Sequence, residues 1–416
     1  MKVFKFGGAS ANSTDRIKNL ATILKKYQGE KLLVVISAMG KTTNALEKVV
    51  DAFYAGNREF SLQLFNQIKF DHINVSEQLK CNSNHLKEFF TEIEWLLHDT
   101  PIKEYDYYYD QIVCIGELLS TSIVSDFLNN EGILNQWMDV RDIIRTDDNF
   151  RNAIIDWNVT SDNVNRKVAA QFDSIGIVLT QGFIGATDEN ESTTLGREGS
   201  DYTAAIFANL LNAENLTIWK DVQGVMNADP KIYKEAQWIS ELNYREVIEM
   251  AYYGAQVIHP KTIKPIHNKN IPLYVRSFIH PDEKGTLIHS KNVDSLPPII
   301  VYKEKQVLLQ LTSRDYSFVG EGLSADIFEL FEDLKFKPNL TQTAAISLLV
   351  IIDDFSDKVN EFAEKASKIC DVSVSKDLTM LTIRHYTDEL FQKLVNGNRI
   401  VLKQQTPETI QVIYKV

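Results

Sequence analysis

The chain has 416 residues, of which 44% are hydrophobic and 24% charged, a composition that excludes global disorder. Its 44 basic and 56 acidic residues give a formal net charge of -12, which argues against nucleic-acid or membrane-surface binding because phosphate groups repel such a chain. Cys81, Cys114 and Cys370 are too widely spaced for a disulfide framework or a zinc motif. We therefore expect a reducing compartment, the cytoplasm. The length predicts two to three domains at about 150 residues each.

Targeting and membrane signals are also lacking in the sequence. The start, MKVFKFGGAS, has lysines where a signal peptide needs an apolar core. No run of about 18 apolar residues predicts a transmembrane helix.

Strands and helices alternate from the first residues, which is typical of an α/β fold with a mainly parallel sheet. Lys2–Phe6 is predicted as a strand ending at Gly7-Gly8, and Ser13–Tyr27 has the apolar spacing of a helix. Lys31–Ile36 (KLLVVI) is apolar along nearly its whole length, as in a strand buried on both faces. A helix over Thr43–Tyr54 follows.

Residues 57–110 are polar and mostly helical, and no chemistry is apparent there. The alternation is then expected to return with strands at Ile112–Gly116, Ile175–Leu179, Leu216–Trp219 and Pro272–Val275, and with helices at Glu117–Asn129, Thr203–Leu211 and Tyr244–Tyr253.

A different pattern begins near residue 300, after Gly285-Thr286-Leu287 and Pro297-Pro298. Short elements there predict a small α+β unit, compatible with a repeated βαβ-like element, although identity between its halves is too low to prove a repeat. The expected strands are Gln306–Thr312, Ala345–Ile352, Thr379–Ile383, Ile400–Lys403 and Ile410–Tyr414, and the expected helices are Leu323–Leu334 and Asp357–Ser367.

Three glycine-marked loops carry candidate chemistry. In Lys5–Ser10 (KFGGAS), two glycines let backbone N–H groups approach an anion and Lys5 adds a charge, although a simple strand-end turn has the same residues. Leu195–Ala205 offers Arg197 for a carboxylate and Asp201, which could equally be a plain helix N-cap. Trp219–Lys231 runs from a strand into a turn-rich loop that could be a surface turn. Loops after parallel strands bind ligands in open α/β sheets, so the pattern predicts an enzyme acting on a phosphate ligand.

Two tempting motifs fail on spacing. Gly40-Lys41-Thr42 lacks the first glycine of a P-loop, because Val35 stands in its place. Gly320–Ala325 matches a dinucleotide-binding pattern, but it does not directly follow a strand and no acidic residue ends a strand about 20 residues later.

Nine segments in order resemble the aspartate kinase family of the amino-acid kinase superfamily. They are Lys5–Ser10, Val34–Asn44 (VVISAMGKTTN), Gly116–Ser120 (GELLS), Asp139–Phe150, Gln181–Gly185, Leu195–Ala205, Trp219–Lys231, Tyr253–Thr262 (YGAQVIHPKT) and Gly285–Ile288. The resemblance implies an amino-acid kinase fold over 1–295, an ACT-like, ferredoxin-like domain over 300–376 and a shortened second one over 377–416. Since the sequence ends at Val416, we expect no fused homoserine dehydrogenase.

The resemblance implies that ATP, with Mg²⁺, phosphorylates the side-chain carboxylate of L-aspartate to 4-phospho-L-aspartate, the first step toward lysine, threonine and methionine. Its nucleophile has a pKa of about 3.9 and is already ionised at neutral pH, so no general base is required. Catalysis then rests on alignment and charge neutralisation.

Residue roles are implied in the same way. Lys5 and Asp201 would be catalytic. The substrate would be held by Ser37, Thr43, Glu117, Arg197 and Ser200, with Arg197 binding its α-carboxylate and Glu117 its ammonium group. The nucleotide would be held by Lys5, Gly7, Gly8, Ser10, Lys220, Asp221 and Lys231. No protein ligand of Mg²⁺ is assigned. Plain structural roles also fit: Glu117 as a first-turn acid, Ser37 and Thr43 as turn or capping residues.

The sequence departs from the family pattern at several positions. Ala9 stands where Thr is usual, Glu198 where Gly is common, and Met226 where many relatives have Tyr. Thr343-Ala344 replaces a Ser-Glu pair found in regulated relatives, so feedback by lysine or threonine is a hypothesis.

Homodimers or larger assemblies formed through the ACT-like parts are expected from the family. Two other functions stay open: a catalytically silent amino-acid sensor, and another amino-acid kinase such as a glutamate or acetylglutamate kinase. Arg197, Glu117 and the ACT-like tail favour aspartate.

Overall fold

A computed structural model describes residues 1–81, 84–255 and 257–415. These residues form two compact units: Met1–Val225 with Trp238–Ile248 and Val257–Val293, and Met226–Gln237 with Glu249–Gln256 and Asp294–Val416. Two short segments inside the predicted catalytic domain, 226–237 and 249–256, thus group with the C-terminal unit, and the domain assignment stays a prediction. Gln256 of the YGAQVIHPKT motif and Val416 lie outside the described residues.

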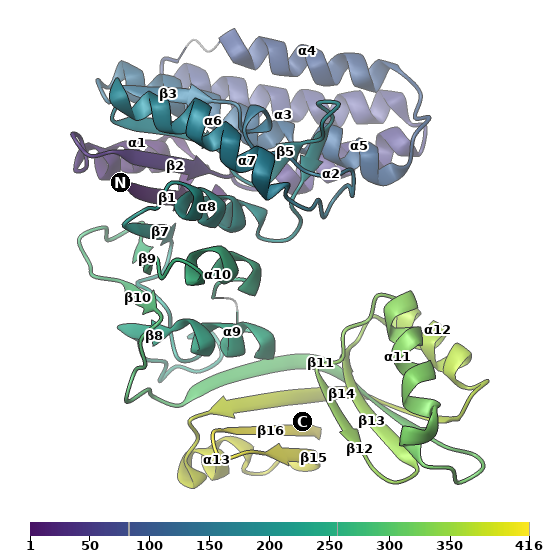
Figure 1. The fold of residues 1–416 in the computed structure, drawn as a ribbon. Helices are drawn as coiled ribbons and strands as arrows, with labels where there is room; N and C mark the ends of the chain where they lie inside the picture. Colours follow the sequence, from purple (N-terminus) through teal and green to yellow (C-terminus); the bar gives the residue numbers. More distant parts are fainter. Residues whose placement is uncertain (82–83, 256, 416) are drawn as a thin grey trace. The chain divides into compact units, whose positions relative to one another are not determined.

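The first unit is built on an eight-stranded sheet in the order β3-β4-β2-β1-β7-β9-β10-β8 (Figure 1). Neighbouring strands are parallel except β9 and β10, which confirms the prediction of a mainly parallel sheet. The strands are β1 Lys2–Phe6, β2 Leu32–Ile36, β3 Asn135–Met138, β4 Ile177–Gln181, β7 Asn215–Lys220, β8 Glu241–Asn243, β9 Leu273–Ser277 and β10 Thr286–His289, and a separate hairpin pairs β5 Ile184–Ala186 with β6 Ser192–Thr194.

Every residue of β2 is buried, as predicted for its continuous apolar run. The helices of this unit are α1 Thr14–Lys25, α2 Thr42–Tyr54, α3 Arg58–Gln78, α4 Asn84–His98, α5 Tyr105–Val113, α6 Ile115–Asn130, α7 Trp157–Asn163, α8 Gly199–Leu210, α9 Tyr244–Tyr253, which continues into the second unit, and α10 Pro260–His267. Helix α6 packs on β2, β3 and β4, whereas α8 packs on β1, β2 and β7. Helices α3 and α4 lie side by side (Figure 1).

The predicted strand at Ile112–Gly116 is wrong. These residues form the end of α5 and the start of α6, with Cys114 at the junction. A short apolar run fits a buried strand and a buried helix equally well, because a helix surrounded by protein needs no polar face. The run belongs to Tyr105–Asn130, which is long and apolar enough to cross a membrane by length and composition alone, but 89% of its apolar window is buried within the protein.

The second unit contains one six-stranded antiparallel sheet in the order β12-β13-β11-β14-β16-β15. Its strands are β11 Ile299–Thr312, β12 Leu340–Thr343, β13 Ser347–Asp353, β14 Asp371–Arg384, β15 Arg399–Gln405 and β16 Thr409–Lys415, and its remaining helices are α11 Leu323–Asp333, α12 Ser356–Ala366 and α13 Asp388–Val395. The 14-residue strands β11 and β14 pair along both halves of the sheet, and their register shifts near Lys303 and Gln306. The predicted boundary at 376/377 falls inside β14, beside Asp377, whose φ is +59°.

The two halves of this sheet are covered differently. In the first half, α11 and α12 pack over a core in which Phe331 and Phe362 stack with ring centroids 4.5 Å apart. In the second half, Ala228 lies in the same apolar cluster as Phe391 of α13 and Leu381 of β14. The segment 226–237 therefore contributes to the core of the second half, which has one helix of its own.

Candidate active site

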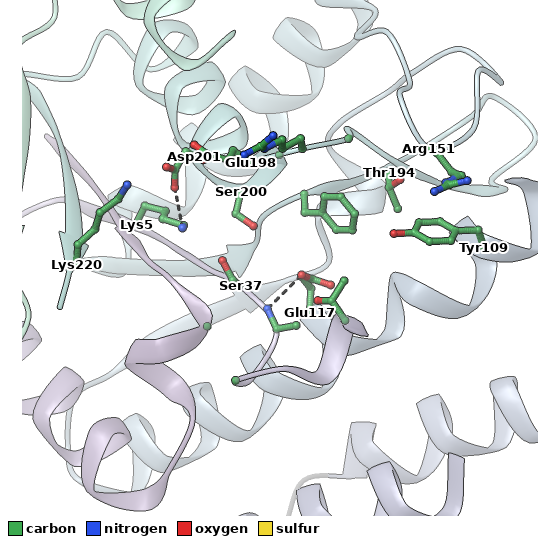
Figure 2. Close-up of a pocket in the computed structure, with 18 residues that line it drawn as sticks. Lys5, Ser37, Tyr109, Glu117, Arg151, Thr194, Glu198, Ser200, Asp201 and Lys220 are labelled. Atoms are coloured by element: carbon green, nitrogen blue, oxygen red, sulfur yellow. Dashed lines mark hydrogen bonds and ion pairs between the residues drawn. The ribbon is translucent and has the colours of Figure 1, made fainter. Parts of the chain in front are cut away.

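A cavity of about 570 Å³ lies in the first unit and brings most of the predicted site residues together (Figure 2). It is bordered by the ends of β1 and β7, by the loops that follow β1 and β2, and by the first turns of α2, α6 and α8. Nine of the predicted residues line it: Lys5, Gly8, Ser37, Thr43, Glu117, Arg197, Ser200, Asp201 and Lys220. Gly7, Ser10, Asp221 and Lys231 do not.

Lys5 and Asp201 form a buried ion pair at one end of the cavity. Lys5 Nζ lies 2.7 Å from Asp201 Oδ1, and the two side chains are only 11% and 5% exposed. β1 places Lys5 one residue before its end, and Asp201 is the third residue of α8, so the pair joins segments almost 200 residues apart. Burial opposes ionisation of Asp201, but the charges of Lys5 and Lys220 outweigh it and lower the pKa of this carboxyl. Asp201 is thus an anion that holds Lys5, rather than a plain N-cap.

Glu117 lies in the first turn of α6 and is buried at the floor of the cavity. Its Oε1 accepts a hydrogen bond from the backbone N–H of Ala38 at 3.1 Å. The other oxygen, Oε2, is buried and has no hydrogen-bond partner among the described residues. Burial raises the pKa of Glu117 to about 8, against the lowering effects of the Ala38 N–H and the Lys5 charge. A buried carboxyl group with one oxygen left without a partner is suited to a cationic group that arrives with the substrate and favours its ionised form.

The glycine loop after β1 makes a close approach to the loop after β2. A Cβ on Gly8 would lie 2.6 Å from the Ala38 carbonyl oxygen, so only glycine fits without displacement of the backbone. The loop continues as a short 3₁₀ helix, Gly8–Ala11, and α1 begins only at Thr14. The start of α1 agrees with the helix predicted from Ser13, and Ser10 is buried inside the loop.

Arg197 and Ser200 reach the cavity from the turn that starts α8. Arg197 is exposed and makes no ion pair with any residue in the described ranges, so its guanidinium is available to an anionic ligand. The neighbouring Glu198 has a left-handed backbone with φ of +54°, which explains why relatives often have Gly there. Ser37 and Thr43 line the cavity from the β2–α2 loop and the first turn of α2.

The residues predicted to hold the nucleotide do not all line the cavity. Lys220 lines the cavity and donates a hydrogen bond to the Val257 carbonyl oxygen at 2.5 Å. Asp221 lies outside the cavity lining and pairs with Arg16 at 2.5 Å. Lys231 is exposed and belongs to the second unit. The nucleotide roles of Asp221 and Lys231 stay predictions.

The sequence analysis missed several cavity-lining side chains, among them Tyr109, Arg151, Phe183 and Thr194. Tyr109 lies in the tyrosine-rich run of α5, within the stretch 57–110 where no chemistry was apparent. Arg151 follows directly after the resembling segment Asp139–Phe150. The only signal was the density of tyrosines, and aromatic residues at helical spacing are more often core residues.

The charges of the cavity suit an anionic ligand although the chain is acidic. Lys5, Arg151, Arg197 and Lys220 face Glu117, Glu198 and Asp201. In the described part of the chain, no group of three or more His, Cys, Asp or Glu side chains could hold a metal ion. Asp201 is the lining carboxylate beside the Lys5 end, so a divalent cation would depend largely on oxygens of a bound phosphate ligand.

Comparisons with known proteins agree with this geometry. Residues 1–277 match the family model described as "Amino acid kinase family". The chain is 29% identical to lysine-sensitive aspartokinase 3 of Escherichia coli over 92% of this chain and 86% of the relative, and 31% identical to chloroplastic aspartokinase 2 of Arabidopsis thaliana over 92% and 73%. The crystal structure of E. coli aspartokinase III in complex with aspartate and ADP matches with a TM-score of 0.84 and 27% identity, covering 100% of this chain and 96% of that one. The chain therefore belongs to the amino acid kinase family and, within it, to the aspartokinases.

Proposed function

We infer that the chain catalyses the ATP-dependent phosphorylation of the side-chain carboxylate of L-aspartate, which yields 4-phospho-L-aspartate and ADP. The observation that carries this inference is one cavity that holds the Lys5–Asp201 pair together with Glu117 Oε2 and the Arg197 guanidinium, which have no partner among the described residues. Relatives named aspartokinases, and a matching structure with aspartate and ADP, support it. This product, 4-phospho-L-aspartate, would be the first intermediate in the biosynthesis of lysine, threonine and methionine.

The chemistry needs positioning more than proton transfer. The substrate carboxylate is ionised at neutral pH and attacks the γ-phosphorus, and the bond to the β-phosphate bridging oxygen breaks. Lys5, held by Asp201, neutralises charge on the phosphoryl oxygens during transfer. Gly8 lets the backbone come close to the phosphates, and Lys220 adds a second cation.

The amino-acid end of the substrate is recognised by complementary charge. Glu117 accepts the α-ammonium, Arg197 binds the α-carboxylate through its planar fork, and Ser37, Thr43 and Ser200 donate or accept hydrogen bonds. Mg²⁺, when bound with ATP, would help to neutralise the charge of the phosphate groups at the Lys5–Asp201 end of the cavity.

Regulation and assembly are further parts of the proposal. The second unit would bind a feedback amino acid, lysine or threonine, and pair subunits as a homodimer or larger assembly. Its single sheet shared by two halves supports this role, whereas Thr343-Ala344 at the end of β12 offers no carboxylate to an effector. Unchanged activity at saturating lysine and threonine would exclude these effectors. Three buried free cysteines support a reducing compartment such as the cytoplasm.

The test is a hydroxylamine trap with purified protein, Mg-ATP and either L-aspartate or L-glutamate. Hydroxylamine converts the acyl phosphate to a hydroxamate. We expect hydroxamate with aspartate only, and none with the Lys5→Met variant. Product with glutamate instead would identify another amino-acid kinase, and no product with either from folded protein would favour a silent sensor.

A further inference from the structure

Arg151 occupies a strained backbone position on the wall of the cavity. Its φ is +65°, a left-handed conformation that is unfavourable for a residue with a side chain. Such strain persists only where surrounding structure imposes it, and it is concentrated at functional sites.

The buried carboxylate of Asp110 imposes this conformation. Asp110 is fully buried at the end of α5. Its Oδ2 accepts hydrogen bonds from the backbone N–H groups of Arg151 at 2.9 Å and Thr194 at 2.8 Å, and its Oδ1 accepts the Thr194 hydroxyl at 2.7 Å. One carboxylate thus holds two cavity-lining residues, from the loop after Phe150 and from β6, in a fixed relation.

The side chain of Arg151 is directed by an aromatic ring and one exposed acid. Its guanidinium carbon lies 4.4 Å from the centroid of the Tyr109 ring, and its Nη1 lies 3.0 Å from Asp106 Oδ1. Tyr109 is itself fixed, because its hydroxyl donates to Glu47 at 2.8 Å. A guanidinium has five N–H donors, so this arrangement leaves most of them for a ligand.

Arg151 lies at the end of the cavity that is opposite Lys5 and Asp201, with Glu117 and Ser37 between them (Figure 2). A dicarboxylic amino acid whose reacting carboxylate faces Lys5 and whose ammonium meets Glu117 presents its second carboxylate to this end. We propose that Arg151 is a second guanidinium contact, beside Arg197, for the α-carboxylate of the amino-acid substrate, and that Asp110 positions Arg151. This inference rests on the proposed function.

The first test is the steady-state kinetics of Arg151→Asn, a substitution that tolerates the left-handed backbone and removes the cation. Loss of a charge-assisted contact that is partly screened by solvent should raise the KM for L-aspartate about tenfold. The KM for ATP and kcat should stay within about twofold, because ATP binds at the other end. Arg151→Lys, which keeps the charge without the fork, should give an intermediate KM.

Asp106→Asn is the matched control. It removes the exposed ion-pair partner of Arg151. If Arg151 acted only through this ion pair, Asp106→Asn should raise the KM for aspartate as much as Arg151→Asn does. A substrate contact predicts the opposite: the guanidinium loses a competing anion, and the KM for aspartate does not rise.

Asp110→Asn tests the positioning role. Its amide would place an NH₂ group against at least one of the three donors that now face the carboxylate. We expect the KM for aspartate to rise while the KM for ATP stays unchanged. If this variant fails to fold, Arg151→Asn still decides the proposal.

Calorimetric titration with L-aspartate separates the two claims. Aspartate turnover with an unchanged KM and affinity in Arg151→Asn overturns the role of Arg151 and leaves the proposed function intact. Absence of both hydroxamate and aspartate binding in the wild type overturns both. Weaker aspartate binding in Arg151→Asn supports the contact independently of turnover.

Discussion

Replacement of Glu117 by Gln should stabilise the ligand-free protein at alkaline pH and weaken its affinity for L-aspartate at least tenfold. The reason is the carboxyl group's burial at the cavity floor, which raises its pKa from 4.5 to about 8. A carboxyl whose folded pKa is raised keeps its proton while the unfolded chain has already lost it. Its contribution to folding therefore falls as the pH rises from about 4.5 to about 8, and it stays low above that range.

The magnitude follows from the shift. At about 1.4 kcal/mol per pKa unit, the difference between 4.5 and about 8 corresponds to at most roughly 5 kcal/mol of folding free energy above pH 8. Gln keeps an oxygen for the Ala38 N–H and carries no charge, so Glu117→Gln should recover several kcal/mol at high pH and almost nothing at pH 4. It should bind aspartate at least tenfold more weakly, because the ammonium loses its anion.

Substrate binding provides a second readout of the same group. With a pKa of about 8, roughly 90% of Glu117 is protonated at pH 7. An arriving ammonium favours the ionised form, so binding should release close to one proton per L-aspartate.

The assays are urea unfolding at several pH values and calorimetric titration of aspartate in buffers of different ionisation enthalpy. The reasoning is refuted if Glu117→Gln gains no stability above pH 8, or if it binds aspartate like the wild type. It is also refuted if the wild type releases no proton at pH 7.

Three further predictions concern the phosphate end of the cavity. Lys5→Met should abolish turnover and lower the free energy of unfolding in urea by roughly 3–5 kcal/mol, because Asp201 stays buried without its cation. The double variant Lys5→Met/Asp201→Asn should recover much of the stability and no activity. Any turnover by Lys5→Met would contradict the role of Lys5. Gly8→Ala should raise the KM for ATP and lower stability by about 1–3 kcal/mol, because the added Cβ would lie 2.6 Å from the Ala38 carbonyl oxygen. Gly320→Ala is its control, since a Cβ there meets nothing within 4 Å and should change neither quantity. EDTA should abolish turnover without changing the thermal midpoint of the ligand-free protein, because no metal-binding cluster is found in the described residues; a lower midpoint would reveal a structural metal.

Much of the fold follows from local sequence patterns. The apolar run of β2 and the apolar face of α1, with Ile17, Leu20 and Leu24 buried, form the elements that their periodicity predicts. The run Ile112–Gly116 does not form the strand predicted for it. It is helical, and a helix buried on all sides lacks the hydrophobic periodicity that would distinguish it from a buried strand. The extension of β11 and β14 across two half-sheets was likewise hidden, since strand pairing over a distance leaves no local signal.

The candidate site divides in the same way. Lys5, Asp201, Glu117 and Arg197 stand in segments that resemble the family, and the structure places all four around one cavity. Asp110 could not be predicted, because its partners Arg151 and Thr194 are contributed by loops and strands more than 40 residues away. Only the folded chain brings these groups within hydrogen-bond distance.

Isotope transfer from the side-chain carboxylate tests the central claim most directly. L-Aspartate labelled with ¹⁸O in that carboxylate is incubated with the protein, Mg-ATP and hydroxylamine, and the inorganic phosphate is analysed by mass spectrometry. If the carboxylate oxygen attacks the γ-phosphorus, hydroxylamine attack at the carbonyl carbon expels phosphate that retains this bridging oxygen. We predict phosphate with a single ¹⁸O atom in amounts equal to the hydroxamate. Phosphate without ¹⁸O would show that phosphate arises by hydrolysis of ATP and would contradict the proposed reaction.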